Sequence, residues 1–233
     1  MTGTFSIVGT PIGNLEDITL RALKTLQVCD YILCEDTRVT QKLLKAYNIT
    51  KSLYKADSHM SVSQLAKIRS LLEEGKHLCL VSDAGMPGIS DPGMFIIEYM
   101  RRAVPEVRIE VIPGVTAVTA AVSLAAVPHN EWMFIGFVPQ KKGRLTAVKE
   151  MATRDSATVM YESSHRIMKL LGELSTHAPE RIIGVGRELT KIYEEFLQGT
   201  ATELNTLLHS NPQKQKGEFV VIVYPLGYNR RHE

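Results

Sequence analysis

The sequence predicts an α/β protein built from two α/β domains. Short apolar runs alternate with amphipathic stretches through the first half of the 233-residue chain, which is typical of a mostly parallel sheet covered by helices. A second series of the same kind begins after Pro113-Gly114. Hydrophobic residues make up 44% of the chain and charged residues 22%, the balance of an ordinary globular protein. We therefore expect one domain over residues 1–113 and another over 114–233.

In the first half, four apolar runs have the length and composition of strands, and a fifth run is weaker. The runs are Phe5–Val8, Tyr31–Cys34, Leu78–Ser82, Val107–Ile112 and, more weakly, Ser52–Lys55. Helical patterns lie between them. Ser61 is a suitable N-cap for a helix that presents Leu65, Ile68 and Leu72 on one face and ends at Gly75. A second helix is expected over Arg38–Tyr47.

The second half begins with a stretch of small apolar residues, Val115–Val127, which predicts a buried helix. Four strands are expected after it, over Trp132–Val138, Thr158–Tyr161, Ile182–Val185 and Phe219–Tyr224. Thr200 and Glu203 have the spacing of a capping box, which predicts a helix from there to Leu208.

Composition excludes several classes of protein. The three cysteines, Cys29, Cys34 and Cys79, include no Cys-x-x-Cys pair and fall in or beside apolar runs, so neither a disulfide framework nor a zinc ribbon is expected. The histidines are scattered and show no metal-ligand spacing, so we predict no metal. No apolar stretch is long enough to cross a membrane, and the N-terminus lacks the pattern of a signal peptide. A cytoplasmic protein without membrane association is expected.

Three loops rich in glycine and proline follow predicted strands: Gly9–Asn14, Ser82–Gly93 and Pro113–Ala117. Ligands of open parallel sheets bind just beyond the carboxyl ends of the strands, so three such loops favour a shared binding site. None has the glycine spacing of a P-loop or of a dinucleotide-binding loop. Asp83 is placed to bind a hydroxyl or amino group of a small ligand, although a turn or cap aspartate would occupy the same position.

Several longer motifs occur in a fixed order between about Thr4 and Tyr224. They are Val8–Thr19, Cys34–Arg38, the Ser82–Gly93 loop, Tyr161–Ser163, His165-Arg166, Arg187–Lys191 with Tyr193–Glu195, and Gly217–Val220. Together they resemble the motifs of the ribosomal RNA small subunit methyltransferase I family, within the tetrapyrrole methylase superfamily. The sequence departs from the family pattern at Met86, usually threonine, and at Ser164, usually proline.

The resemblance implies two α/β domains of the tetrapyrrole methylase type, with S-adenosyl-L-methionine in the cleft between them, and a homodimer. It implies 2′-O-methylation of a cytidine ribose in 16S rRNA, either free or in the assembled small ribosomal subunit. By the same resemblance, cofactor contacts would fall on Pro11, Ser82, Asp83, Ala84, Gly88, Thr116 and Ala117, and on Glu162, Gly217, Glu218 and Phe219 in the second domain.

A ribose hydroxyl is a poor nucleophile, so a base or a cation should help it to lose its proton. Lys191 and Glu188 are our candidate catalytic residues, although they could equally form an ion pair without a catalytic role. The net charge of +2 neither requires nor excludes a nucleic-acid partner, so RNA contacts are sought in local basic groups. The candidates are Arg38, Lys141, Lys142, Arg144, Arg166 and Arg187.

Two other functions stay open at this point. A methyltransferase of the same fold could act on a small tetrapyrrole, although the basic cluster Lys141–Arg144 and the motif agreement favour RNA. A non-catalytic RNA-binding module would not need the cofactor-type loops. The basic cluster itself could be no more than a solvated surface loop.

Overall fold

The computed structural model describes residues 2–128 and 131–228. The chain divides into two compact units, 1–116 and 117–233. The division falls slightly later than the boundary expected after Pro113. The reason is that the loop after the last strand of the first unit stays with that unit: Gly114 lies directly against the backbone of Gly9. Each unit is described below by itself.

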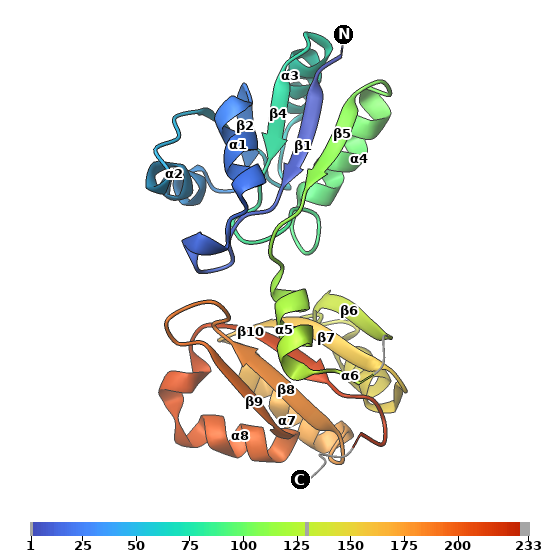
Figure 1. Cartoon of the computed structure of the whole chain (residues 1–233). Coiled ribbons are helices and arrows are strands. Elements are labelled where there is room, and N and C mark those ends of the chain that lie inside the picture. The colour runs from blue at the N-terminus through green and yellow to red at the C-terminus, as the bar shows by residue number, and fades with distance from the viewer. Residues whose placement is uncertain (1, 129–130, 229–233) are drawn as a thin grey trace. The chain divides into compact units, whose positions relative to one another are not determined.

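The first unit contains a five-stranded sheet in the order β3-β2-β4-β1-β5, in which all neighbouring strands are parallel (Figure 1). This confirms the parallel sheet expected from the alternating pattern. The strands are β1 (Thr4–Val8), β2 (Tyr31–Cys34), β3 (Ser52–Lys55), β4 (His77–Leu80) and β5 (Arg108–Ile112). Since β1 and β4 are central, the loops that follow them open at the middle of the sheet edge.

Helices cover both faces of this sheet. They are α1 (Leu20–Val28), α2 (Thr37–Ala46), α3 (Val62–Glu73) and α4 (Gly93–Ala103), and a short 3-10 helix, η1 (Leu15–Asp17), precedes α1. On one face, Leu26 of α1 and Leu44 of α2 pack in a core with Ile32. On the other, Leu72 of α3 and Met100 of α4 pack around the strands in a second core. The N-cap predicted at Ser61 is confirmed, and the structure adds a capping box, because the side chains of Ser61 and Gln64 cap α3 reciprocally.

The second unit contains a five-stranded sheet in the order β6-β7-β10-β8-β9, in which only β6 and β7 pair in parallel. Its strands are β6 (Trp132–Phe137), β7 (Ala157–Ser163), β8 (Ile182–Arg187), β9 (Glu195–Thr200) and β10 (Glu218–Val223). Its helices are α5 (Ala117–Ala125), α6 (Arg144–Thr153), α7 (Ile167–His177) and α8 (Ala201–Ser210), with a 3-10 helix η2 (Pro212–Gln215). The capping box at Thr200 is confirmed at the start of α8.

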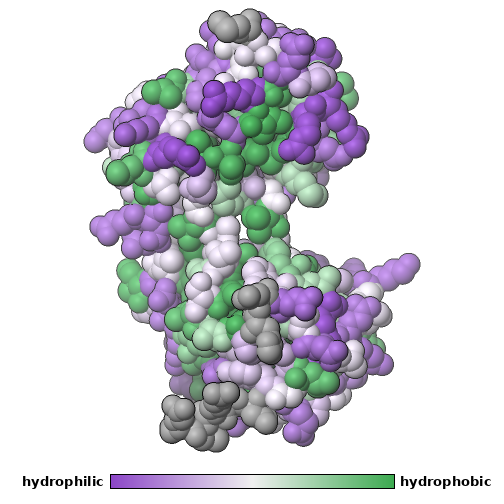
Figure 2. Space-filling view, turned by 45° about the vertical axis from the view of Figure 1, so that its right-hand side comes forward, coloured by the Kyte–Doolittle hydropathy of each residue, from purple (hydrophilic) through white to green (hydrophobic). Residues whose placement is uncertain are grey.

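The core of the second unit joins α6, α7 and α8 to one face of its sheet, through residues such as Met151, Leu170 and Leu204. Helix α5 lies across the other face (Figure 1). It is anchored by the Tyr224 hydroxyl, which donates to the Ala125 carbonyl at 2.6 Å. The visible surface of each unit mixes hydrophilic and hydrophobic residues (Figure 2). Within the described residues, no helix is both long and apolar enough to cross a bilayer.

Candidate functional site

The loops after β1 and β4 are joined through their backbones. The Thr10 amide donates to the Gly85 carbonyl at 3.0 Å, and the Gly85 amide donates back to the Thr10 carbonyl at 3.2 Å. The Ser82 hydroxyl donates to the same Gly85 carbonyl at 2.9 Å, and the Thr10 hydroxyl donates to the Ser82 carbonyl at 3.1 Å. Two of the three loops predicted from sequence therefore form one hydrogen-bonded structure at the carboxyl edge of the sheet.

The loop after β5 joins this structure through two glycines. The Gly9 amide donates to the Ile112 carbonyl at 3.0 Å. A Cβ atom placed on Gly9 would lie 2.7 Å from the Gly114 Cα and 2.6 Å from the Met86 sulfur. Only glycine allows the two backbones to come this close.

The long loop between β4 and α4 is shaped by Asp91. Its carboxylate accepts hydrogen bonds from the Gly88 amide, at 2.9 and 3.0 Å, and from the Gly93 amide at 2.7 Å. Gly88 has a φ of +84°, and a Cβ atom placed there would point towards Ile97 and Met94 of α4. The glycine at this position is therefore required by backbone conformation.

Carboxylates gather at this edge of the sheet. The Asp83 Oδ1 atom accepts from the Asp36 amide at 3.0 Å, and burial raises the pKa of Asp83 although that hydrogen bond opposes the shift. Burial and then the charge of Asp83 raise the pKa of Glu35. The hydrogen bond from the exposed Arg38 lowers the pKa of Asp36 to about 2. An electronegative edge of this kind favours a ligand that carries cationic groups.

The cofactor residues expected in the first unit differ in exposure. Pro11, Ser82 and Thr116 are buried, so they would act through their backbones or shape the loops. Asp83 and Gly88 are half-buried and Ala84 is exposed, so the part of the Ser82–Gly88 loop open to a ligand is centred on Asp83 and Ala84. Ala117 is the first residue of α5 and belongs to the second unit.

In the second unit, the structure gives two of the expected cofactor residues other partners. The Glu162 side chain is buried, with one carboxylate oxygen 2.8 Å from Arg166 Nε and the other 3.8 Å from the Arg144 guanidinium. Phe219 is 2% exposed and packs in the core. Because both side chains face the interior, cofactor contact through them is not retained. Gly217 and Glu218 lie beside Glu188 and Lys191 instead.

The turn after β8 carries both candidate catalytic residues. Glu188 and Thr190 have φ angles of +48° and +65°, which are uncommon for residues other than glycine and concentrate at functional sites. The Lys191 ammonium lies 3.0 Å from Glu188 Oε1 and 3.0 Å from Glu218 Oε2. The strained turn thus holds a lysine between two carboxylates.

These contacts decide the charge of the two residues. Burial acts to lower the pKa of Lys191, but the hydrogen bonds to Glu188 and Glu218 outweigh it and raise this pKa. Burial acts to raise the pKa of Glu188, but the Glu218 amide and Lys191 outweigh it and lower that pKa. Lys191 is therefore a cation at neutral pH and Glu188 a weakened base. As placed, the pair suits electrostatic stabilisation better than proton abstraction.

Three of the arginines expected to bind RNA are engaged inside the second unit. Arg144 is buried and pairs with Glu173 at 2.8 Å, and its guanidinium also donates to the Pro139 carbonyl. Arg187 is 9% exposed and donates to the carbonyls of Lys216, Tyr193 and Gln213. Because these guanidinium groups hold the fold together, phosphate binding by Arg144 and Arg187 is not retained.

Arg166 is also engaged: its guanidinium donates to the Val138 carbonyl and lies over the Phe137 ring, in addition to its pairing with Glu162. The remaining RNA candidates are exposed. Lys141 and Lys142 lie in the loop before α6, and the Arg38 side chain is 86% exposed beside Asp36. Within the described residues there is no cluster of three or more histidine, cysteine or acidic side chains that could hold a metal ion.

Comparison with known proteins identifies the family to which this chain belongs. A family model described as Tetrapyrrole (Corrin/Porphyrin) Methylases matches residues 4–205. The chain belongs to the tetrapyrrole methylase family. This confirms the superfamily inferred from the motifs, and the two sheets described above are the tetrapyrrole methylase fold.

Among relatives of this tetrapyrrole methylase is a protein of Thermotoga maritima named Ribosomal RNA small subunit methyltransferase I. It is 40% identical, and the match covers 95% of the present chain and 98% of the relative. A protein of the same name from Neisseria meningitidis is 42% identical over 99% of the chain and 79% of its own length. The resemblance inferred from the motifs is thereby confirmed.

Solved structures support the fold at lower identity. The methyltransferase CobJ superposes with a TM-score of 0.71 and 20% identity, over 99% of this chain and 98% of its own. Uroporphyrin-III-C-methyltransferase from Thermus thermophilus gives a TM-score of 0.65 and 20% identity, over 95% and 94% of the two chains. At this identity the likeness shows the tetrapyrrole methylase fold alone.

Methyltransferases of this family use S-adenosylmethionine, and the loops at the carboxyl edge of the first sheet fit such a group. The half-buried Asp83 and Glu35 have raised pKa values, so a positively charged sulfonium or ammonium group brought to them would be stabilised. The backbone bridge between Thr10 and Gly85 supplies a preformed loop surface beside them.

Replacing Lys191 with alanine is expected to slow methyl transfer by roughly 100-fold, the usual cost of losing a group that stabilises developing negative charge. Affinity for S-adenosylmethionine, measured by calorimetry, should change little. If the cation is what matters, Lys191→Arg will recover part of the rate in single-turnover assays. Lys149→Ala removes an exposed lysine of α6 and serves as the control. Full single-turnover activity in Lys191→Ala would remove this residue from the chemistry.

Proposed function

We propose that this tetrapyrrole methylase is an enzyme that transfers a methyl group from S-adenosylmethionine to the 2′-hydroxyl of a cytidine ribose in 16S rRNA. The observation that carries the proposal is the 40% identity, over 95% of the chain, to a relative named Ribosomal RNA small subunit methyltransferase I. The solved tetrapyrrole-modifying relative from Thermus thermophilus is only 20% identical. Sequence similarity therefore favours RNA over a tetrapyrrole as the substrate.

The proposed roles of the residues follow from their surroundings. S-adenosylmethionine supplies a methyl group that is already activated by its sulfonium, so the protein chiefly has to orient the acceptor hydroxyl. Asp83 and the joined loops at residues 9–14 and 82–93 would hold the cofactor. Lys191, kept cationic by Glu188 and Glu218, would stabilise the ribose oxygen as its proton leaves. The methyl group moves from the sulfonium to the ribose oxygen, the cofactor sulfur leaves as a neutral thioether, and the hydroxyl proton is released to water.

The proposal is tested by mixing the purified protein with S-adenosylmethionine labelled in its methyl group and three acceptors in parallel. The acceptors are free 16S rRNA, assembled small ribosomal subunits, and uroporphyrinogen as the tetrapyrrole. We expect label in one cytidine of the RNA, resistant to alkaline cleavage at the adjacent phosphate because the 2′-oxygen is blocked. Label in uroporphyrinogen alone would reverse the assignment of substrate. Binding of RNA with no transfer to any acceptor would support the non-catalytic alternative.

We further propose that the protein acts in the cytoplasm as a homodimer, as the family resemblance implies. A subunit of 26.0 kDa makes this simple to test, because light scattering after gel filtration should give about twice that mass. A mass of one chain across the working concentration range would contradict the dimer.

Lys141 and Lys142 are expected to contact RNA phosphates. Each contact releases condensed counterions, so the logarithm of RNA affinity should fall with the logarithm of salt concentration by roughly 0.7 per contact for single-stranded RNA. Lys141→Gln/Lys142→Gln should reduce the magnitude of this slope by about 1.4. Arg144 is left unchanged, because it is buried in an ion pair. If the salt slope of the variant were unchanged, the two lysines would be solvated residues that do not contact RNA.

A further inference from the structure

The first unit has a groove that shares Arg38 with the site described above and is otherwise lined by residues not used there. It lies between α2 and the edge strand β3 and encloses about 1100 Å³. Leu44 and Leu53 are among its lining residues, together with four basic side chains: Arg38, Lys42, Lys45 and Lys51. No aspartate or glutamate and no aromatic ring lines it among the described residues. The groove is therefore strongly cationic.

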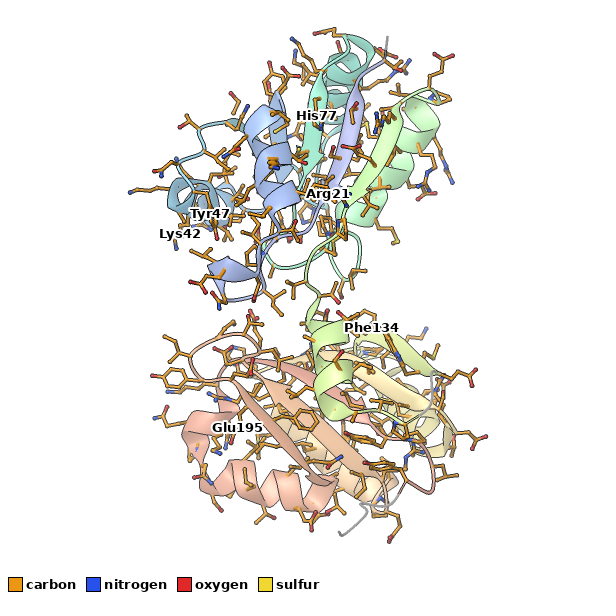
Figure 3. The ribbon with its side chains drawn as sticks, viewed as in Figure 1. Arg21, Lys42, Tyr47, His77, Phe134 and Glu195 are labelled. Carbon is orange, nitrogen blue, oxygen red and sulfur yellow. The ribbon has the colours of Figure 1, made fainter. Side chains whose placement is uncertain are left out.

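Three of the basic residues form a row along α2. Arg38, Lys42 and Lys45 are spaced i, i+4 and i+7, which puts them on one side of the helix. At 1.5 Å of rise per residue, the row is about 10 Å long. Lys42 and Lys45 are exposed, and Lys42 is labelled on α2 in Figure 3. Leu44 of the same helix packs in a core with Leu26 and Ile32, so the row is held in place by the fold.

The four basic side chains of the groove are available to a ligand to different degrees. Within the described part of the chain, neither Lys42 nor Lys45 forms an ion pair with a carboxylate. Arg38 pairs with Asp36 on the protein surface, where such a pair is weak. Lys51 is oriented by a hydrogen bond of 2.6 Å from its ammonium to the Cys29 carbonyl. The groove thus has two lysines without a carboxylate partner, and its other two cations are held by short contacts.

We propose that this groove binds the phosphate backbone of the RNA substrate and positions it beside the candidate site. The inference rests on the proposed function for the identity of the polyanion. The row begins at Arg38, just after the carboxyl end of β2, where Glu35 and Asp36 border the candidate site. Since no aromatic ring is present on which a base could stack, the groove contacts backbone and does not select sequence.

The test compares two double variants of equal charge change. Lys42→Gln/Lys45→Gln removes the two free cations of the groove. Lys67→Gln/Arg101→Gln removes two exposed cations from α3 and α4, outside the groove. The probe is an unmodified single-stranded RNA oligonucleotide with a 16S rRNA sequence, and its affinity is measured across a range of salt concentrations. The groove variant should lose about 1.4 from the magnitude of the salt slope, and the control should lose none.

Two further readouts separate this inference from the proposed function. In the groove variant, the fall in kcat/KM should appear as a higher KM for RNA, and calorimetry should find its affinity for S-adenosylmethionine unchanged. Suppose that the wild-type protein methylates RNA and that the groove variant has the same salt slope and the same KM for RNA. RNA binding by the groove would then be contradicted. Suppose instead that the wild-type protein methylates no RNA but the salt slope is reduced in the groove variant. The proposed function would then be contradicted, and RNA binding by the groove would be supported.

Discussion

Replacing Arg144 with methionine is expected to lower the free energy of unfolding by about 3–5 kcal/mol, the usual result of removing one partner from a buried ion pair. The Arg144 side chain is 5% exposed and lies 2.8 Å from Glu173, and the neighbouring Glu162 side chain is fully buried. Methionine keeps most of the apolar stem of arginine and lacks the guanidinium, so the loss reports the ion pair and hydrogen bonds of that group. Urea unfolding followed by circular dichroism measures it.

Lys169→Met is the matched control, since Lys169 approaches the same Glu173 at 4.0 Å but is 61% exposed. Exposed pairs of this kind contribute about 0–1 kcal/mol, so the control should stay close to wild type. If Arg144→Met were instead as stable as wild type and bound RNA more weakly, the arginine would be an RNA contact after all.

Gly9→Ala should cost about 3 kcal/mol of stability, at the upper end of the range for overpacking, because its methyl group would meet backbone that cannot move aside. The Gly114 nitrogen and Cα would lie 2.8 and 2.7 Å from the added carbon. Separating the loops after β1 and β5 should also disturb the loop surface beside Asp83. We therefore expect affinity for S-adenosylmethionine, measured by calorimetry, to fall at least about tenfold, which corresponds to 1.4 kcal/mol.

Gly172→Ala provides the opposite control. A Cβ atom placed on Gly172, inside α7, would make only an ordinary contact of 3.8 Å with Asn205. Alanine favours helix over glycine, so this variant should gain about 0.5–1 kcal/mol and bind the cofactor normally. Equal behaviour of the two alanine variants would mean that the contact between Gly9 and Gly114 is not required.

The parts of the fold that could be predicted are those with local signals. The N-cap at Ser61, the capping box at Thr200 and the apolar runs of β1, β2 and β10 are such signals, and all of them are found in the structure. Strand β9 (Glu195–Thr200) was not predicted. It is an edge strand with Gln198 and Gly199 in place of an apolar run, and it is specified by its antiparallel pairing with β8.

The candidate site shows the same division. Glycine- and proline-rich loops after strands predicted a shared binding edge, and the structure brings those loops together in the first unit. The role of Arg144 could not be predicted, because its partner Glu173 is far along the chain on α7. Lys141, Lys142 and Arg144 are neighbouring basic residues in the sequence, and nothing in their order indicates that the Arg144 side chain is buried. The i, i+4, i+7 spacing of Arg38, Lys42 and Lys45 is visible in the sequence, but only the fold shows that this side of the helix borders a groove.

The reciprocal hydrogen bonds between Thr10 and Gly85 have a consequence for the thermodynamics of ligand binding. They close the loops after β1 and β4 with the backbone's own hydrogen bonds, so the conformational entropy of these segments is lost during folding. Ligand association then has little backbone left to order, and more of the interaction free energy appears as affinity. The amides of Thr10 and Gly85 should accordingly exchange hydrogen slowly for loop residues, already in the free protein.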